Sequence, residues 1–359
     1  MAETGQIVKN VTVRRYLQSN TCKFDGSMPH VCCHQADTTE EQHCLHQTQD
    51  QDTSQGDDQD AGQGDDQPSS CGQVQSVQDL RCVGCDSTSP GDWPWMARLL
   101  YKDNIEQNSA VTFCGGILVS SRHVITAGHC VETGNIPDKV VLGDSDISTD
   151  FDCLDVESGC NVAGRRCFRS GLCAPKHVEV TVRAVVRHPE YRYCEDCVTT
   201  YDIAIIILDD LVRFSTFIQP ICLPSYLPSD KTVQAPLVMT GWGNIHAGFF
   251  KHVPAKVLQQ LVVQEVPLKK CGDIWGTKLL PNQMCASSGT PGQAPCQGDS
   301  GGPLVRLVDR RSEIWELAGV VSFGPGVCGN VDHPVGLSRI SGELLEWVRG
   351  VVGRYEVGR

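Results

Sequence analysis

The chain has 359 residues, 40% of them hydrophobic, which is enough for one large or two ordinary globular domains with a full core. Its 20 cysteines argue against a reducing cytosol and favour an oxidising, extracellular setting. The net charge of −13 is unevenly placed, because residues 34–70 are rich in acidic residues and contain no Lys or Arg. Such a segment does not bind nucleic acid, and we expect no nucleic acid among the partners.

The first residues, MAETGQIVKN, lack the apolar run of a secretory signal, and no later run is long enough to span a bilayer. We expect a secreted, extracellular protein with no membrane partner. Its signal peptide is then absent from this sequence, either because it was removed or because the start is incomplete. The triplet NVT at Asn10 is an N-glycosylation acceptor, which agrees with secretion.

Three zones follow one another along the chain. Residues 1–33 contain the stretch CKFDGSMPHVCC, residues 34–70 form an acidic Gln- and Asp-rich run, and from Cys71 the chain becomes apolar. The middle zone cannot bury enough apolar surface to offset its chain entropy, so we interpret it as a flexible linker.

After about residue 93, short β-branched runs alternate with Gly, Pro and Asn, which predicts an antiparallel β protein rather than βαβ units. These runs are GGILVSSRHVITA (115–127), KVVLGD (139–144), HVEVTVRAVV (177–186), IAIIIL (203–208) and APLVMTGWG (235–243). A closing helix is predicted at ISGELLEWVRGVV (340–352), where Ser341 is a candidate N-cap. Its apolar face would hold Ile340, Leu344, Val348 and Val351.

Three stretches carry the residue types of nucleophilic catalysis. TAGHC contains His129, YDIAIIIL contains Asp202, and GDSGGP contains Ser300. A serine hydroxyl attacks only when a base takes its proton and a buried carboxylate orients that base. The glycines around Ser300 permit a tight turn that aims the N–H groups of Gly298 and Ser300 at a developing oxyanion. Each of these residues alone could serve a structural role, and Asp202, for example, could merely end a strand. The three motifs in this order nevertheless predict catalysis.

From about Cys82 to Trp347 the chain resembles the chymotrypsin-like serine proteases, through the motifs TAGHC, YDIAIIIL and GDSGGP. The resemblance implies an all-β fold of two six-stranded antiparallel barrels with a C-terminal helix and an active site in the cleft between the barrels. It further implies His129 as general base, Asp202 as the residue that orients it, and Ser300 as nucleophile.

Further residues map onto the family's substrate-binding strand. Ser322, in VVSFGPGVCG, resembles the serine that hydrogen-bonds the buried Asp, and the SFG segment with Phe323 resembles the strand that pairs with the substrate backbone. Ala294 stands where trypsin-like members carry Asp, so a buried basic side chain would lack a counter-charge. Gly324 leaves one wall of the pocket open, whereas Val335, where many members have Gly, makes it shallower. We predict cleavage after small or medium apolar residues.

The resemblance also implies a zymogen. DLRCVG aligns with the usual Arg followed by Ile-Val-Gly-Gly, so 71–81 is the predicted activation segment and 82–359 the protease domain. An upstream trypsin-like protease would cut after Arg81, and the new terminus at Cys82 would pair with Asp299. Cys82 and Cys85 depart from the family pattern, and a ring between them would block this insertion. A redox role for this CxxC is disfavoured, because no thioredoxin-like βαβ unit surrounds it.

The cysteines give several expected disulfides. By the resemblance the three family pairs are Cys114 with Cys130, Cys271 with Cys285, and Cys296 with Cys328. We further expect Cys71 with Cys222 to tether the front segment to the protease domain, and Cys153 with Cys173 to close an inserted loop. Cys194 and Cys197, near His188, could in principle hold zinc, but in a secreted protein we favour disulfides. Asp144 stands where some relatives bind calcium, and a solvated acidic loop explains it equally well, so we predict neither a metal nor a cofactor.

The front segment RRYLQSNTCKFDGSMPHVCC resembles the closing half of a clip domain, the small six-cysteine module of arthropod extracellular proteases. Only Cys22, Cys32 and Cys33 are present, so residues 1–33 are interpreted as a partial clip segment. LGDSDISTDFDC and HPEY also resemble protease domains that follow clips. These features favour a secreted serine endopeptidase of an immune or developmental cascade, with a protein substrate and possible regulation by a serpin-type inhibitor.

Two other functions are compatible with the chain. A clip-type protease homologue that acts as a non-catalytic cofactor is favoured by Cys82, Cys85, Pro295 and Val335, but such proteins usually lose the catalytic serine, and Ser300 is present. A digestive elastase-like enzyme is disfavoured by the front segment and the long linker. Labelling of Ser300 by a fluorophosphonate, before and after cleavage at Arg81, would discriminate between an enzyme and a cofactor.

Overall fold

The structure is a computed structural model whose description covers part of the chain. The described residues are 21–25, 28–31, 71–74, 88–102, 114–153, 156–158, 167–169, 173–194, 198–225, 237–244, 253–290, 294–309, 313–325 and 332–357. The chain divides into two compact units, residues 1–65 with 78–81, and residues 66–77 with 82–359. The predicted linker at 34–70 and residues 75–81 of the predicted activation segment 71–81 lie outside the described residues, so the predicted domain boundaries stay predictions.

The first barrel of the large unit is a closed antiparallel sheet in the order β10-β5-β4-β3-β6-β9. Its strands are β3 (Met96–Leu100), β4 (Gly115–Leu118), β5 (His123–Thr126), β6 (Lys139–Leu142), β9 (Val178–Arg187) and β10 (Ala204–Leu208). Every residue of β10 is buried, as its continuous β-branched run predicts for a strand inside a packed core. β4 and β5 form a hairpin, and the short 3-10 helix η1 (Gly128–Val131) follows β5 directly.

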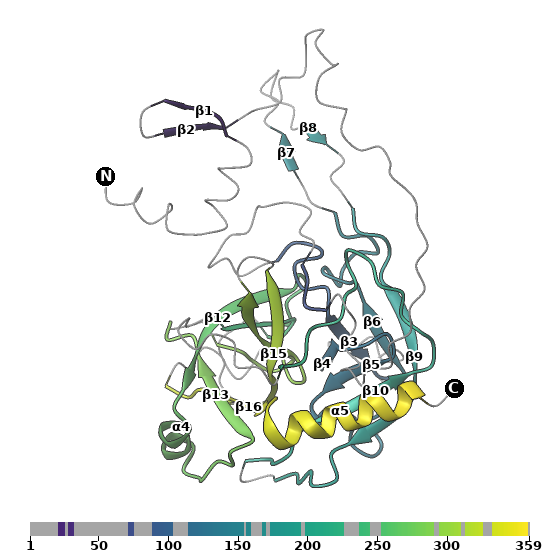
Figure 1. The fold of residues 1–359 in the computed structure, drawn as a ribbon, viewed down its shortest axis with the longest axis vertical. Helices are drawn as coiled ribbons and strands as arrows, with labels where there is room; N and C mark the ends of the chain where they lie inside the picture. The colour runs from purple at the N-terminus through teal and green to yellow at the C-terminus, as the bar shows by residue number, and fades with distance from the viewer. Residues whose placement is uncertain are drawn as a thin grey trace, which may run out of the picture. The chain divides into compact units, whose positions relative to one another are not determined.

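The second barrel is also closed and antiparallel, in the order β11-β12-β13-β16-β15-β14. Its strands are β11 (Leu237–Gly241), β12 (Gln259–Val266), β13 (Gln283–Ser287), β14 (Pro303–Asp309), β15 (Ile314–Phe323) and β16 (Val335–Arg339). Figure 1 shows the two barrels side by side, with the strands of the first barrel in blue and teal and those of the second in green. The expected all-β fold of two six-stranded barrels is therefore confirmed.

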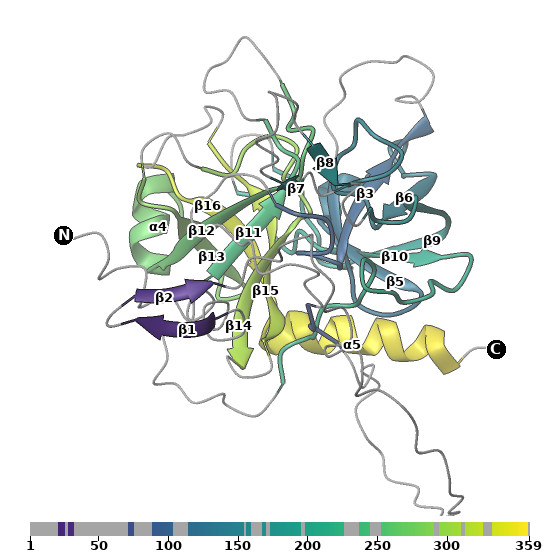
Figure 2. The ribbon, with the colours of Figure 1, turned by 90° about the horizontal axis from the view of Figure 1, so that it is seen from above.

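Two helices accompany the barrels in the described part of the chain, α4 (Leu268–Trp275) and α5 (Gly342–Val357). α5 runs beneath β15 and β16 towards β10 and β5 (Figures 1 and 2). It begins directly after Ser341, as predicted, and Leu344, Val348 and Val351 are fully buried in the core cluster that includes β5 and β10. The apolar face of this helix therefore packs against the first barrel.

The predicted strands are found with small changes. The run 115–127 is two strands separated by a turn, because Ser120 and Ser121 interrupt its β-branched residues. Helix α4 was not predicted, although Pro267 precedes it and Gly276 ends it in the left-handed conformation with φ 64°. No described helix is long and apolar enough to cross a membrane.

Two small antiparallel sheets stand outside the barrels. β1 (Thr21–Asp25) pairs with β2 (Met28–Val31) in the small unit, within the predicted partial clip segment. β7 (Val156–Ser158) pairs with β8 (Cys167–Arg169) inside the loop that the Cys153–Cys173 disulfide closes.

Candidate active site

One carboxylate holds His129 through two hydrogen bonds, one to its backbone and one to its imidazole. His129 is the second residue of η1, immediately after β5, and Asp202 lies just before β10, the strand that pairs with β5. The backbone N–H of His129 donates to Oδ1 of Asp202 at 2.8 Å, and Nδ1 of His129 lies 2.8 Å from Oδ2. Both the position and the ring orientation of His129 are therefore set by Asp202.

Asp202 is itself fixed by the second barrel. Its side chain is almost fully buried, and Oδ2 accepts a hydrogen bond from the hydroxyl of Ser322 at 2.5 Å. The hydroxyl of Ser338 donates to the main-chain carbonyl of Asp202 at 2.8 Å. Because β15 and β16 supply these two serines, the buried carboxylate joins the two barrels.

The surroundings of His129 raise its pKa above the ordinary value. Burial is the largest influence and lowers the pKa, but the charge of Asp202, the hydrogen bond to it and the charge of Glu132 together outweigh burial. An imidazole that holds a proton more readily is suited to take one from a hydroxyl group.

Ser300 lies in a tight turn between the two barrels. The N–H of Gly115 in β4 donates to the carbonyl of Ser300 at 2.8 Å, and the N–H of Gly301 donates to Val321 in β15 at 2.9 Å. Gly298 and Gly301 have φ of 100° and 76°, in the region that favours glycine. Across the residues that the structure describes, the N–H groups of Gly298 and Ser300 have no acceptor, so both are available to an oxyanion.

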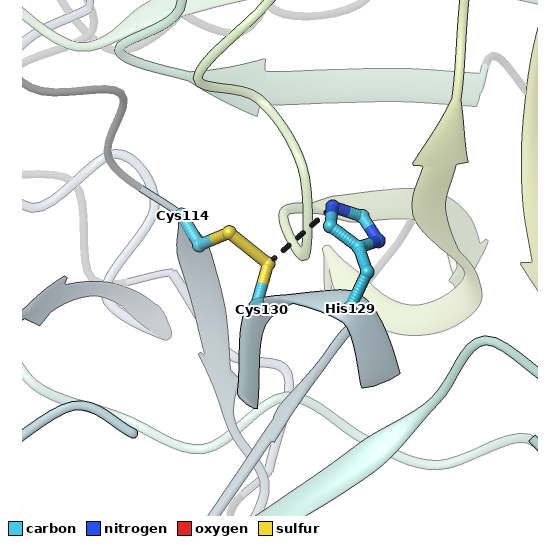
Figure 3. Close-up of side chains that lie close together, drawn as sticks. All are labelled: Cys114, His129 and Cys130. Atoms are coloured by element: carbon cyan, nitrogen blue, oxygen red, sulfur yellow. Dashed lines mark hydrogen bonds between the residues drawn. A yellow bond between two sulfur atoms is a disulfide. The ribbon is translucent and has the colours of Figure 1, made fainter. Parts of the chain in front are cut away.

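The hydroxyl of Ser300 makes no hydrogen bond to His129 in the described part of the structure. Nε2 of His129 instead contacts Sγ of Cys130 at 3.7 Å, as the dashed line in Figure 3 shows. In enzymes without substrate such catalytic hydrogen bonds are often long and tighten only when the substrate binds.

Asp299, next to Ser300, is a buried carboxylate without a cationic partner among the described residues. Oδ1 accepts the N–H of Gly243 at 2.9 Å, and Oδ2 accepts the N–H of Cys296 at 2.8 Å. The fit is close, because a Cβ at Gly243 would lie 2.4 Å from Oδ2. Burial raises the pKa of Asp299 to about 6, although these two hydrogen bonds act in the opposite direction. The predicted partner, Cys82, and the predicted cleavage site at Arg81 lie outside the described residues.

The predicted pocket residues come from three neighbouring segments. A Cβ built at Gly324 would lie 3.7 Å from Cγ2 of Val335, so these two residues face each other. Val335 is buried, whereas Ala294 and Phe323 are half-buried. The ring of Phe323 lies against Gly336, the residue that it opposes in the β15–β16 pair. The space between Gly324 and Val335 is therefore narrowed by a branched side chain.

Four disulfides join described residues. They are Cys71–Cys222, Cys114–Cys130, Cys153–Cys173 and Cys271–Cys285. Cys296 and Cys194 are also disulfide-bonded. Cys328, the expected partner of Cys296, and Cys197 lie outside the described residues. Since the sulfur of Cys194 is used in a disulfide, it is not a thiolate ligand for zinc.

Two further positions bear on metal binding. Cys114, His129 and Cys130 place their ligand atoms within 4.8 Å of one another, but both sulfurs belong to one disulfide, as Figure 3 shows, and a disulfide sulfur is not a thiolate ligand. Asp144 is buried and pairs with Arg98, whose Nη2 lies 2.6 Å from Oδ2. That ion pair gives Asp144 a structural partner inside the protein.

The sequence did not single out Glu132 and Tyr191, which lie beside the site. The hydroxyl of Tyr191 donates to Oε1 of Glu132 at 2.5 Å, and Glu132 caps the C-terminal end of η1. The motif HPEY contains Tyr191, but 59 residues separate the two partners, and no local pattern reveals such a contact.

Two closed barrels and a buried Asp–His pair beside a GDSGGP turn define a chymotrypsin-like serine protease. The trypsin family model matches residues 82–160 and 170–348. The chain belongs to the trypsin family of serine proteases and is a serine endopeptidase.

The similar proteins come from insects, and one of them is named as a clip-domain serine protease. "Serine protease ea" of Drosophila melanogaster is 31% identical over 78% of this chain and 70% of its own length. "Phenoloxidase-activating factor 1" of Holotrichia diomphalia is 29% identical over 94% of this chain and 84% of its own length. "CLIP domain-containing serine protease B9" of Anopheles gambiae is 30% identical over 75% of this chain and 63% of its own length. The expected resemblance to clip-type proteases is thereby confirmed.

Proposed function

We propose that this chain is a secreted zymogen of an extracellular proteolytic cascade in immunity or development, activated by cleavage after Arg81. The observation that carries the catalytic assignment is the double hydrogen bond between Asp202 and His129 at 2.8 Å. A carboxylate that orients an imidazole in this way serves proton transfer in a hydrolase, whereas a binding protein has little need of it. The name "Phenoloxidase-activating factor 1" of one relative supports an action on another protein.

In the proposed mechanism Ser300 Oγ attacks the substrate carbonyl while its proton passes to Nε2 of His129. Asp202 stabilises the imidazolium that forms. The N–H groups of Gly298 and Ser300 bind the oxyanion, each supplying roughly 10²–10³ in rate. His129 then gives the proton to the leaving amine, and a water molecule, activated by the same imidazole, releases the acyl group from Ser300.

Activation depends in this proposal on Asp299. Cleavage after Arg81 creates an α-amino group at Cys82, and a buried carboxylate with a raised pKa is stabilised by a cation that enters its site. Pairing of the new amino group with Asp299 would fix the turn that carries Ser300. Cys82 buries less apolar surface than the usual Ile, and a ring between Cys82 and Cys85 would oppose insertion. A trypsin-like protease acts upstream, and a serpin-type inhibitor suits the activated enzyme.

We further propose cleavage after small or medium apolar residues. No carboxylate stands at Ala294 to neutralise a basic side chain. Val335 faces Gly324 and takes space that a large aromatic side chain would need. Alanyl, valyl and leucyl substrates should therefore be cleaved better than arginyl ones.

The alternative of a non-catalytic cofactor rests on Cys82, Cys85, Pro295 and Val335. Against it, the hydrogen bonds of Asp202 to His129 and to Ser322 are those that a working base requires. The described grounds for the cofactor, Pro295 and Val335, concern the pocket and leave the Asp202–His129 pair intact.

The test is fluorophosphonate labelling of the full chain before and after cleavage at the Arg81–Cys82 bond. Labelling only after cleavage supports a zymogen. Ser300→Ala is the control for the labelled residue, and Arg81→Gln is the control for the cut. A correctly cleaved, folded protein that is not labelled would overturn the assignment in favour of the cofactor.

A further inference from the structure

A second carboxylate lies beside the imidazole of His129, and it is held by a tyrosine. Glu132 is the residue that follows η1, three positions after His129, so both belong to the same turn. The hydroxyl of Tyr191 donates to Oε1 of Glu132 at 2.5 Å. Hydrogen bonds to an ionised acceptor are short and about twice as strong as neutral ones. Tyr191 therefore fixes the end of the turn that carries the base.

The ring of Tyr191 packs against the other end of this turn. A Cβ built at Gly128 would lie 2.7 Å from Cδ2 and 3.0 Å from Cε2 of Tyr191, and 3.2 Å from Oδ1 of Asp202. Real Cβ atoms do not approach so closely, so only glycine at 128 leaves room for the ring. Arg187 lies over the ring, with Cζ 4.7 Å from its centroid. The ring thus contacts the turn from Gly128 to Glu132 at both ends.

The segment that presents Tyr191 is rigid in its own right. The N–H of Tyr191 donates to the carbonyl of His188 at 3.0 Å, and the N–H of His188 donates to Ile203, next to Asp202, at 3.1 Å. The ring of His188 stacks on Tyr201 with centroids 4.8 Å apart. One turn, His188 to Tyr191, is consequently anchored both to the segment of Asp202 and to the turn of His129.

We propose that Tyr191 and Glu132 are positioning residues for the general base: Tyr191 clamps η1 at Gly128 and Glu132, and Glu132 adds a second negative charge at the end of the turn that carries His129. This inference rests on the proposed function, which assigns His129 as base. Neither residue contacts the reacting atoms. They act through the orientation and the protonation of His129.

The electrostatic part of the proposal involves the few charged or titratable groups around His129. Asp202 contacts the imidazole of His129 directly, and Glu132 ends the turn that contains His129. The phenol of Tyr191 contacts Glu132, and Arg187 lies over the ring of Tyr191. After burial, which lowers it, the pKa of His129 is raised by Asp202 and then by Glu132. Glu132 is half-buried, so solvent weakens its influence but does not abolish it. Removal of that charge should lower the pKa of His129.

Two substitutions separate the charge from the clamp. Glu132→Gln removes the charge but keeps an oxygen that accepts the hydroxyl of Tyr191. Tyr191→Phe keeps the charge and the ring but removes the hydrogen bond. Glu179→Gln is the matched control, because Glu179 is a carboxylate of the same barrel that pairs with Lys139 and does not act on the pKa of His129.

The first measurement is an NMR titration of His129 in full-length Ser300→Ala protein, which does not require activity. The spectrum of His129→Gln assigns the signal. Glu132→Gln should lower the pKa of His129 by about half a unit, and Glu179→Gln should leave it unchanged. A Glu132→Gln protein that titrates as the Ser300→Ala parent does would overturn the role of the charge.

The second measurement is the pH profile of kcat/KM for the cleaved enzyme with Ser300 intact. For Glu132→Gln the acidic limb should move to lower pH in step with the titration. For Tyr191→Phe we expect about a threefold to tenfold loss of kcat with little change in KM, because the turn of His129 loosens. Loss of thermal stability without either kinetic change would overturn the clamp. Absence of fluorophosphonate labelling would instead overturn the proposed function, and the titration alone would then decide the coupling.

Discussion

The two buried carboxylates on either side of the candidate active site differ in how they are satisfied. Asp202, on the side of the first barrel, accepts hydrogen bonds from the backbone and side chain of His129 and from Ser322. Asp299, on the side of the second barrel, accepts hydrogen bonds from the backbone N–H groups of Gly243 and Cys296 and from no other described residue. Its raised pKa reflects burial without a cation among the described residues.

Among the described residues, the half of the site around Asp202 has its hydrogen-bond partners in place. The half around Asp299 has no cation to pair with its carboxylate. The base and its support are in place before any cleavage, because they depend on strand pairing within the first barrel and on two serines of the second. The turn of Ser300 contains a carboxylate that would gain from a positive charge. If activation proceeds as we propose, the switch acts at Asp299 rather than at His129.

The largest effect is expected when the carboxylate that orients His129 is replaced. Asp202→Asn should lower kcat by about 10⁴-fold, a typical loss for this change in serine proteases. An amide NH2 next to Nδ1 would hold the imidazole in the tautomer that cannot accept the proton of Ser300. Steady-state kinetics of the cleaved enzyme give the number, and Asp210→Asn, an exposed neighbour, is the control. Activity close to that of the parent would mean that Asp202 does not orient the base.

A smaller loss of activity is expected when Asp299, on the second-barrel side of the site, is replaced. After cleavage at Arg81, Asp299→Asn should lower kcat/KM by roughly 10²–10³, the effect of losing an oxyanion donor, because the turn with Gly298 and Ser300 is no longer fixed. Fluorophosphonate labelling should slow in parallel. If the cleaved Asp299→Asn enzyme labels at the rate of the parent, the new terminus does not activate through Asp299.

The same carboxylate makes a pH prediction for the uncleaved protein. Its pKa is raised from 3.8 to about 6 on folding, so the folded state holds the proton more tightly than the unfolded state does. The contribution of Asp299 to stability is therefore largest below pH about 4 and is lost as the pH rises through about 6, by up to ~3 kcal/mol. Urea unfolding across this range should show the slope, and Asp299→Asn should remove it. Asp273→Asn, on the surface of α4, should keep it.

The pocket on the second-barrel side gives a test of specificity. Val335→Gly removes the side chain that faces Gly324 and should shift the ratio of kcat/KM for phenylalanyl over alanyl substrates by about 10-fold to 100-fold. Because Val335 also packs against core residues of that barrel, a loss of stability accompanies the change. An unchanged ratio in a folded variant would show that Val335 does not limit the pocket.

Much of this architecture could be predicted from the sequence, for identifiable reasons. The β-branched runs around Ile125 and Ile205 mark strands because they lie within single elements, and the GDSGGP motif is local. Helix α4 escaped prediction because Gly272 and Cys271 weaken its helical pattern between Pro267 and Gly276. The contact of Tyr191 with Glu132 was invisible, since folding alone brings two residues 59 positions apart together.

The smallest expected effect separates two serines that hold Asp202 in different ways. Ser322 donates to the carboxylate, whereas Ser338 donates to the main-chain carbonyl. Ser322→Ala should lower kcat/KM by about threefold to tenfold, because one hydrogen bond to a buried charge is lost while the two bonds to His129 remain. Ser338→Ala should reduce thermal stability and leave the pH profile unchanged. Equal kinetic losses in both variants would show that the position of Asp202, and not the solvation of its charge, is what the second barrel provides.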